Sequence, residues 1–154
     1  MTLLAGRARV FSAELLTNPC FSAWTTDDPD GWTVAGETGV ASEISEVGKG
    51  QGHGDVGTGY CNLFVLDAIV DTVEISQDIL VLGNKYYCSI NVDTVLEGGI
   101  YITENDNVVV NYTTAGVRQF TFTATETKFA VRSNRGGGII DDVTIGCVSV
   151  IREV

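Results

Sequence analysis

The sequence predicts an all-β protein whose antiparallel strands form a sandwich or a barrel. Apolar and polar residues alternate in short stretches that recur about every ten to fifteen residues, as is typical of half-buried strands. Glycine supplies 18 of the 154 residues, and turn-forming residues separate the alternating stretches. Helical periodicity is nearly absent, and only residues 5–16 offer material for a short helix. Strands without helices between them pair in an antiparallel way.

The expected strands follow one another through the second half of the chain. They are residues 72–82, 86–95, 100–103, 107–113, 117–124, 128–133 and 139–151. Gly83-Asn84 and Gly98-Gly99 mark turns, and residues 104–107 close a hairpin. Alternation predicts one face turned to the core, with Tyr86, Cys88, Ile90, Val92, Phe120, Phe122 and Ala124. The opposite face then carries Tyr87, Ser89, Asn91, Asp93, Gln119, Thr121 and Thr123.

Length and charge divide the chain into one domain and an arm. A chain of 154 residues with 44% hydrophobic residues fits a single domain with a core. Residues 1–13 carry two Arg and no acid, whereas the rest has seven cations and twenty acids, a formal charge of −13. We interpret residues 1–13 as an N-terminal arm and residues 14–154 as the sandwich domain.

The formal net charge of −11 argues against two classes of partner. Broad nucleic-acid surfaces and docking on anionic membranes both need clustered cations. Arg7 and Arg9 interrupt the short apolar start, so no export signal is expected there. The chain has four cysteines, none of them in a C-x-x-C pair: Cys20, Cys61, Cys88 and Cys147. Without an export signal, we expect the protein to be made in a cytoplasm and all four cysteines to be reduced.

A glycine-rich stretch, residues 46–60, interrupts the strand pattern with six Gly. It is interpreted as a surface loop, and alternatively as a protruding contact loop, because loops on a rigid sandwich commonly bind partners. It is not a phosphate loop, because no G-K-S/T sequence follows it.

Six short motifs follow one another between residues 14 and 150: Leu15–Phe21, Asp30-Gly31-Trp32, Ile75-Ser76-Gln77, Lys85–Ser89, Gly116–Ala124 and Ile140–Ile145. In this order they resemble galactose-binding-like jelly rolls, the fold of carbohydrate-binding modules. The resemblance implies a two-sheet jelly-roll sandwich. Modules of this type occur on secreted glycanases and in structural proteins of tailed bacteriophages.

Two functions are compatible with this resemblance. The chain carries no catalytic domain and no recognisable export signal, which favours a phage virion protein assembled in the host cytoplasm. Such a protein would decorate or cement the capsid, or sit on the tail, as a dimer or trimer attached by its arm and sandwich edge. The expected arm contacts are Leu3, Leu4, Arg7, Arg9, Val10 and Phe11. The alternative is a glycan-binding module that adheres to cell-surface polysaccharide.

The resemblance also implies a structural calcium near Asp141. Asp141 shares strand parity with Val143 and Ile145, so we expect it to point inward and to need a cation or several donors. Similar modules place a Glu where this chain has Ser22. Asp142, Thr17 and backbone carbonyls are the remaining candidate ligands, and a hydrogen-bonded buried carboxylate without metal is the alternative.

Aromatic residues are the candidates for stacking on sugar rings: Trp24, Tyr60, Tyr87, Tyr101 and Tyr112. Tyr87 is the best of them, because it lies on the polar side of its strand with Asn91 and Asp93. Aromatic residues of a sandwich more often pack in the core or across strands, and Trp32 of the Gly-Trp motif is expected to be packed rather than to bind a ligand.

No enzymatic activity is expected. His53 is the single histidine, and it lies in the glycine-rich stretch with no residue to orient it. The acids of Asp27-Asp28-Pro29-Asp30 fit a solvated turn rather than a pair of carboxylates for glycoside hydrolysis.

Overall fold

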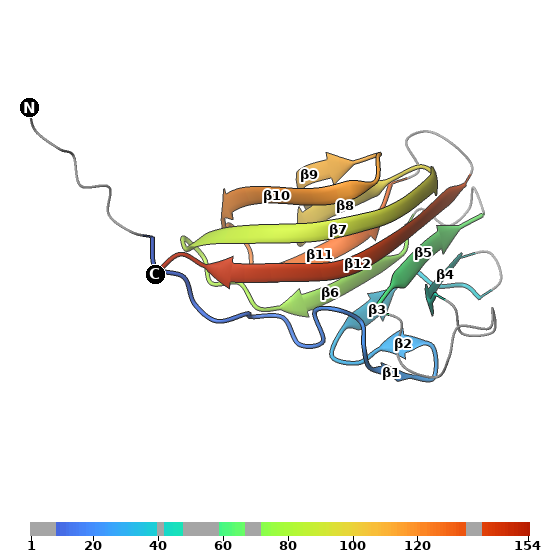
Figure 1. Cartoon of the computed structure of the whole chain (residues 1–154), viewed down its shortest axis with the longest axis horizontal. Helices are drawn as coiled ribbons and strands as arrows, with labels where there is room; N and C mark the ends of the chain where they lie inside the picture. The colour runs from blue at the N-terminus through green and yellow to red at the C-terminus, as the bar shows by residue number, and fades with distance from the viewer. Residues whose placement is uncertain (1–8, 40–41, 48–58, 67–71, 135–139) are drawn as a thin grey trace, which may run out of the picture.

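The computed structural model describes residues 9–39, 42–47, 59–66, 72–134 and 140–154. These residues form twelve strands and no helix, so the predicted all-β class is confirmed. Two five-stranded antiparallel sheets pack face to face (Figure 1), which confirms the predicted sandwich. Within the described ranges, no helix is long and apolar enough to cross a membrane.

The first sheet has the strand order β10-β7-β12-β5-β4. Its strands are β10 (Gly116–Thr123), β7 (Lys85–Glu97), β12 (Asp141–Arg152), β5 (Cys61–Val65) and β4 (Ser42–Glu46). The long strands β7 and β12 lie side by side along the length of the molecule (Figure 1). The residue-by-residue alternation predicted for β7 and β10 is confirmed by their burial.

The second sheet has the order β3-β6-β11-β8-β9. Its strands are β3 (Thr33–Ala35), β6 (Glu74–Asp78), β11 (Lys128–Ser133), β8 (Ile100–Glu104) and β9 (Asn107–Tyr112). A small ribbon of β1 (Trp24–Thr25) and β2 (Asp28–Pro29) lies beside the sandwich. The first half of the chain thus contains five strands that alternation did not predict, because they are only two to five residues long.

The core lies between the two sheets and consists almost wholly of aliphatic and aromatic side chains. Its largest fully buried members are Tyr86, Phe21, Phe129, Ile44, Leu63, Ile75, Ile90, Ile100, Ile102 and Ile145. Trp32 is also buried, as the sequence predicted for the Gly-Trp motif. This core makes the sandwich a rigid support for the residues that face outward.

Residues 10–19 run along the edge of β12 that β5 leaves free (Figure 1). The Ser12 N–H donates to the Arg152 carbonyl at 2.8 Å, and the Leu15 N–H donates to the Val150 carbonyl at 3.1 Å. Phe11 forms an antiparallel bridge with Glu153. Part of the predicted arm therefore pairs with the last strand of its own domain. Leu3, Leu4 and Arg7 lie outside the described residues, as do residues 48–58 with His53.

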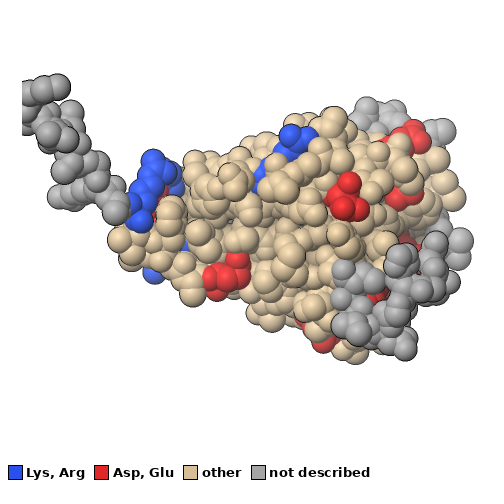
Figure 2. Space-filling model, in the orientation of Figure 1, with Lys and Arg blue, Asp and Glu red and all other residues tan. Residues whose placement is uncertain are grey.

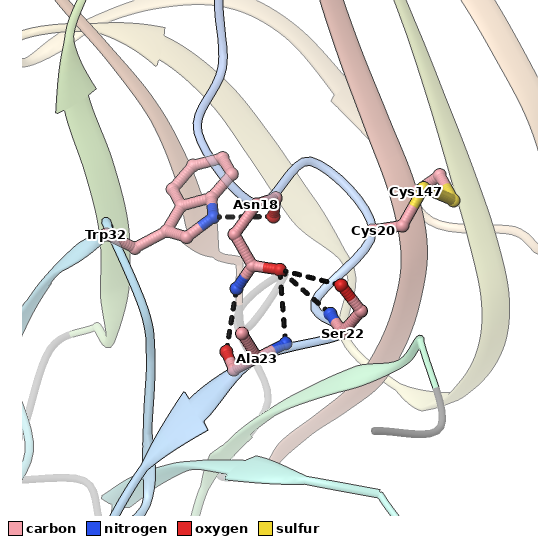
Figure 3. Close-up of a disulfide and its surroundings, with 6 residues drawn as sticks. All are labelled: Asn18, Cys20, Ser22, Ala23, Trp32 and Cys147. Atoms are coloured by element: carbon pink, nitrogen blue, oxygen red, sulfur yellow. Dashed lines mark hydrogen bonds between the residues drawn. A yellow bond between two sulfur atoms is a disulfide. The ribbon is translucent and has the colours of Figure 1, made fainter. Parts of the chain in front are cut away.

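Cys20 and Cys147 form a disulfide (Figure 3), so the expectation of four reduced cysteines is wrong for this pair. Cys147 follows Gly146 at an irregularity of β12, where the register with β7 shifts between Ile145 and Val148. The shift leaves Cys147 exposed, although its two neighbours are buried. The pairing joins residues 127 positions apart, which strand patterns do not reveal.

Asn18 builds the turn that presents Cys20 to β12 (Figure 3). Its side chain accepts the Ser22 N–H at 2.8 Å and donates to the Ala23 carbonyl at 2.7 Å. The backbone of Asn18 is left-handed, with φ of 49°, a conformation that Asn tolerates better than most residues. The other two cysteines, Cys61 and Cys88, are buried and free, and burial raises the pKa of both thiols.

Candidate functional site

One outer surface of the sandwich, on the first sheet, is free of charged side chains over much of its area. We define the uncharged face as the outward side chains in the middle of β7, β10 and β12: Tyr87, Ser89, Asn91, Val117, Gln119, Thr121, Ser149 and Ile151. Figure 2 shows an area without Lys, Arg, Asp or Glu in the middle of this view, bordered by a Lys or Arg side chain above it and by Asp or Glu side chains to its right and lower left. In a chain of net charge −11, such an area is suited to an uncharged, polar ligand.

Strand register brings the side chains of the uncharged face into rows. Gln119 pairs with Ser89, and Ser89 pairs on its other side with Ser149. The next row is Thr121, Tyr87 and Ile151. Directly opposite residues of an antiparallel pair point to the same side, so each row combines side chains from three strands. The face therefore offers hydroxyl and amide groups beside an aromatic ring and an aliphatic side chain.

An aromatic corner closes the uncharged face at the end where residues 9–11 and the last residues of β12 lie. The rings of Phe11 and Tyr87 have centroids 6.1 Å apart and planes tilted by 58°. Ile151, the cross-strand partner of Tyr87, is half-buried beside them. Phe11 is 39% exposed, so the corner is open to solvent.

A glycine lets Asn91 lie against β12. A Cβ atom at Gly146 would come within 2.8 Å of the Asn91 Nδ2 atom, closer than normal packing allows. With the Asn91 side chain in this position, there is no room for a side chain at position 146 of β12. Farther along the sheet, Asn62 on β5 donates to Asp142 Oδ1 at 2.9 Å, so this carboxylate is already engaged.

The aromatic residues predicted from the sequence do not come together. Tyr87 lies on the uncharged face, and Tyr101 lies on β8 of the second sheet, between the buried Ile100 and Ile102. Tyr112 contacts Phe120 with ring centroids 6.3 Å apart, at the edge between the two sheets.

Trp24 and Tyr60 lie elsewhere again. Trp24 is on β1 and donates from Nε1 to the Phe21 carbonyl at 2.7 Å. Tyr60 precedes β5, and its carbonyl accepts the Val47 N–H at 3.4 Å. Of the five candidates, only Tyr87 therefore belongs to the uncharged face. Phe11 joins it through the tertiary structure, although the sequence had indicated Phe11 as an arm contact.

Asp141 is fully buried at the start of β12, as strand parity predicted. Its Oδ1 atom accepts the Gly99 N–H at 2.8 Å, while Oδ2 has no hydrogen-bond partner within the described part of the chain. Burial raises the pKa of this carboxyl to about 6, and the backbone groups of Gly99 and Asn134 and the Ser133 side chain, which lower the pKa, offset burial only in part. Gly98, with φ of 76°, passes so close to the carboxyl group that no Cβ atom fits.

The candidate calcium ligands do not form one site. Asp142 faces the opposite way from Asp141, toward Asn62, because the two are adjacent on one strand. The Thr17 backbone binds the Gln77 amide, with distances of 3.0 and 2.8 Å. Among the described residues, no group of three His, Cys, Asp or Glu could hold a metal ion. The three predicted ligands thus do not fit a common calcium site, and a calcium ion in this protein stays a prediction.

The outer surface of the second sheet is charged, in contrast to the uncharged face. Glu74, whose side chain is 8% exposed, pairs with Lys128 Nζ at 2.8 Å and with Arg132 Nε at 2.9 Å. Arg132 also pairs with Asp106 at 2.8 Å. These groups satisfy one another, so the first sheet is the better candidate for a binding surface.

Comparison with known proteins identifies this fold by structure rather than by sequence. Neither a protein-family model nor a curated protein sequence matches the chain. The structure is similar to the carbohydrate-binding module TmCBM61, solved with β-1,4-galactotriose, with a TM-score of 0.56 and 18% identity over 92% of this chain and 100% of that one.

Two larger proteins contain a similar part. One is the arabinose-bound α-L-arabinofuranosidase MgGH51, with a TM-score of 0.52 and 14% identity over 90% of this chain and 26% of that one. The other is the enzymatically active domain of bacteriophage CBA120 tailspike protein 4, with a TM-score of 0.54 and 10% identity over 89% of this chain and 21% of that one. At these identities the likeness concerns the fold alone. This chain is an antiparallel sandwich with the jelly-roll fold of carbohydrate-binding modules.

Proposed function

We propose that this protein is a non-catalytic glycan-binding module that holds a carbohydrate on the uncharged face of its first sheet. The observation that carries the proposal is the uncharged face itself, which combines an aromatic corner with amides and hydroxyls on a chain of net charge −11. A sugar ring has an apolar face and a rim of hydroxyl groups, and this surface offers a counterpart to each.

The expected binding mode follows from the arrangement of the rows. The apolar face of one sugar ring packs on Tyr87, with Phe11 as a side wall. Hydroxyl groups of this ring and of its neighbour bind the amides of Asn91 and Gln119 and the hydroxyl of Ser89. Neutral hydrogen bonds that replace bonds to water contribute about 1 kcal/mol each, so we expect modest affinity.

The similarity to TmCBM61 supports this proposal, because that module was solved with β-1,4-galactotriose. It supports the fold and the class of ligand, not the identity of the sugar.

We also propose that the module is part of a phage particle and that it is located on the capsid or on the tail. Two observations favour it: the fold similarity to part of a phage tailspike protein, and the Cys20–Cys147 disulfide. Disulfides persist on virion and cell surfaces as well as in secreted proteins, so the disulfide favours exposure outside a reducing cytoplasm. Attachment to a capsid or tail protein through residues 1–13, and assembly as a dimer or trimer, are parts of the same proposal.

Affinity electrophoresis tests the glycan-binding proposal. Native gels containing galactan, arabinan, β-glucan or xylan are run with the wild type, Tyr87→Ala and Tyr101→Ala. Tyr101 is the matched control, because it is also a partly exposed strand tyrosine but lies on the second sheet. At least one polysaccharide should retard the wild type and Tyr101→Ala but not Tyr87→Ala. Equal retardation of both variants would show that the site does not lie on the uncharged face. If no polysaccharide retards the wild type and no glycan on a broad array binds it, the proposal is wrong.

A further inference from the structure

A small cluster of charges lies at the same end of the uncharged face as the aromatic corner. Glu153 pairs through Oε1 with Arg9 Nε at 3.6 Å and through Oε2 with Lys85 Nζ at 3.3 Å. One carboxylate therefore serves two cations, so these three side chains together carry one net positive charge. Figure 2 shows Lys and Arg side chains gathered at this end. On a chain of net charge −11, local positive charge of this kind marks a site for a negative group.

The charge cluster adjoins the aromatic corner. Lys85 lies two positions before Tyr87 on β7, so both side chains are on the same side of the sheet. Glu153 is the bridge partner of Phe11, and Arg9 lies two positions before Phe11. The two cations thus stand beside the two rings, within reach of a group attached to a sugar that packs on Tyr87.

The cations of the cluster are available to a ligand. The side chains of Arg9 and Lys85 are 59% and 44% exposed, and their distances to Glu153 exceed those of good charge-assisted hydrogen bonds. Exposed ion pairs of this kind contribute little to stability, so their partial exchange for a ligand carboxylate costs little. Glu153 holds the two cations near each other before the ligand arrives.

We propose that the module prefers a glycan bearing one acidic sugar residue, a uronic acid, whose ring packs in the Phe11–Tyr87 corner and whose carboxylate pairs with Lys85 and Arg9. This inference rests on the proposed glycan-binding function. The remainder of the glycan is neutral, because the rest of the uncharged face has no cation and Asp93 is exposed farther along β7. A uniformly acidic polysaccharide would meet repulsion there.

The test compares matched probes by isothermal titration calorimetry. Each pair of probes consists of a neutral trisaccharide and its counterpart with one uronate. The first pair is β-1,4-galactotriose and the same trisaccharide oxidised to a carboxylate at C6 of its non-reducing residue. The other pairs are the corresponding trisaccharides of β-glucan and of xylan. We expect the acidic member of one pair to bind about threefold to tenfold more tightly at low salt. The preference should shrink as the salt concentration rises.

Charge variants locate the preference. Lys85→Gln and Arg9→Gln should each reduce the preference for the acidic probe, and the double variant should abolish this preference. The affinity for the neutral probe should be unchanged. Lys128→Gln, on the second sheet, is the control and should leave the preference intact. Melting temperatures establish that each variant is folded.

The outcomes separate this inference from the function on which it rests. Equal affinity for both members of every bound pair, or a preference that survives the double variant, would overturn the inference and leave the glycan-binding function standing. A failure of every probe and every polysaccharide to bind would overturn both.

Discussion

Phe11 and Tyr87 meet on the outer surface of the first sheet, with ring centroids 6.1 Å apart and ring planes tilted by 58°. Phe11 belongs to the segment that the sequence indicated as an arm for contacting another chain, and Tyr87 is the residue that it favoured as a sugar platform. The structure joins the two because Phe11 bridges Glu153 at the end of β12. The N-terminal segment is therefore part of the candidate binding surface.

The first prediction concerns this corner. Phe11→Ala should weaken glycan binding severalfold, because it removes one wall of the corner, with only a small effect on the melting temperature, since the ring is 39% exposed. Val10→Ala is the matched control, because Val10 is 60% exposed on the same segment. Calorimetry with any glycan that the wild type binds measures the difference. Equal affinity of the two variants would exclude Phe11 from the site.

The second prediction concerns the disulfide. Reduction, or the Cys20→Ser/Cys147→Ser double variant, should lower the free energy of unfolding by about 2–5 kcal/mol, because the bond closes a long loop in the unfolded chain. Urea unfolding with and without a reducing agent measures the change. The double variant is the control, and it should not respond to the reducing agent. Ellman's reagent should find no reactive thiol in the native wild type, since Cys61 and Cys88 are buried.

The third prediction concerns Asp141 and pH. Burial raises the pKa of this carboxyl to about 6 from its ordinary value of 3.8, so the folded protein favours the protonated form. Between these two values the unfolded chain loses this proton while the folded chain keeps it. The stability contribution of Asp141 is therefore largest below about pH 4 and falls as the pH rises to about 6, by roughly 2–3 kcal/mol in total.

Urea unfolding between pH 4 and pH 7.5 measures this contribution. Asp141→Asn should remove the Asp141 part of the pH dependence, whereas Asp142→Asn, on the outward side of the same strand, should retain most of it, because burial contributes more to the raised pKa than the charge of Asp142 does. Asp141→Ala should lower the melting temperature, because it leaves the Gly99 N–H without its partner. Identical pH profiles for the wild type and Asp141→Asn would contradict the raised pKa. Chelation with EDTA tests the predicted calcium separately, and a fall in melting temperature would support it.

The fourth prediction concerns the charged surface of the second sheet. Glu74→Gln should lower the free energy of unfolding by about 1–3 kcal/mol, because it leaves Lys128 and Arg132 without the carboxylate that pairs them. Asp106→Asn is the comparison, and it should lower the free energy of unfolding much less than Glu74→Gln does, because the Asp106 side chain is 80% exposed and solvent screens its ion pair. Chemical unfolding measures both. Glycan binding should be unchanged in both variants, since neither residue lies on the uncharged face.

The fifth prediction concerns the N-terminal segment. Deleting residues 1–8 keeps Phe11 and Ser12 in the chain, so the melting temperature of this variant is the reference for a longer deletion. Deleting residues 1–13 should lower it, because this removes the hydrogen bonds between Ser12 and Arg152, at 2.8 and 2.9 Å, together with Phe11. The shorter deletion is therefore the cleaner test of attachment to a particle. If residues 1–8 contact a capsid or tail protein, occupancy in particles that lack the protein should fall for this deletion, and equal occupancy would place the attachment surface on the sandwich.

The sequence by itself determined the all-β class, which side chains of the long strands point inward and which point outward, and the burial of Asp141. These follow from the two-residue period of a strand, which is a local property: Tyr86 and Tyr87 must point to opposite sides wherever β7 lies. The outward positions of Asn91 and Gln119 were predictable for the same reason. The tertiary structure alone decided the Cys20–Cys147 disulfide, the Phe11–Tyr87 corner and the pairing of Arg9 and Lys85 with Glu153. Each of these joins residues far apart in the chain, and the paths of β12 and of residues 10–19 bring them together. Local alternation contains no information about which distant strand edge a segment will meet, because that choice depends on the packing of the whole sandwich.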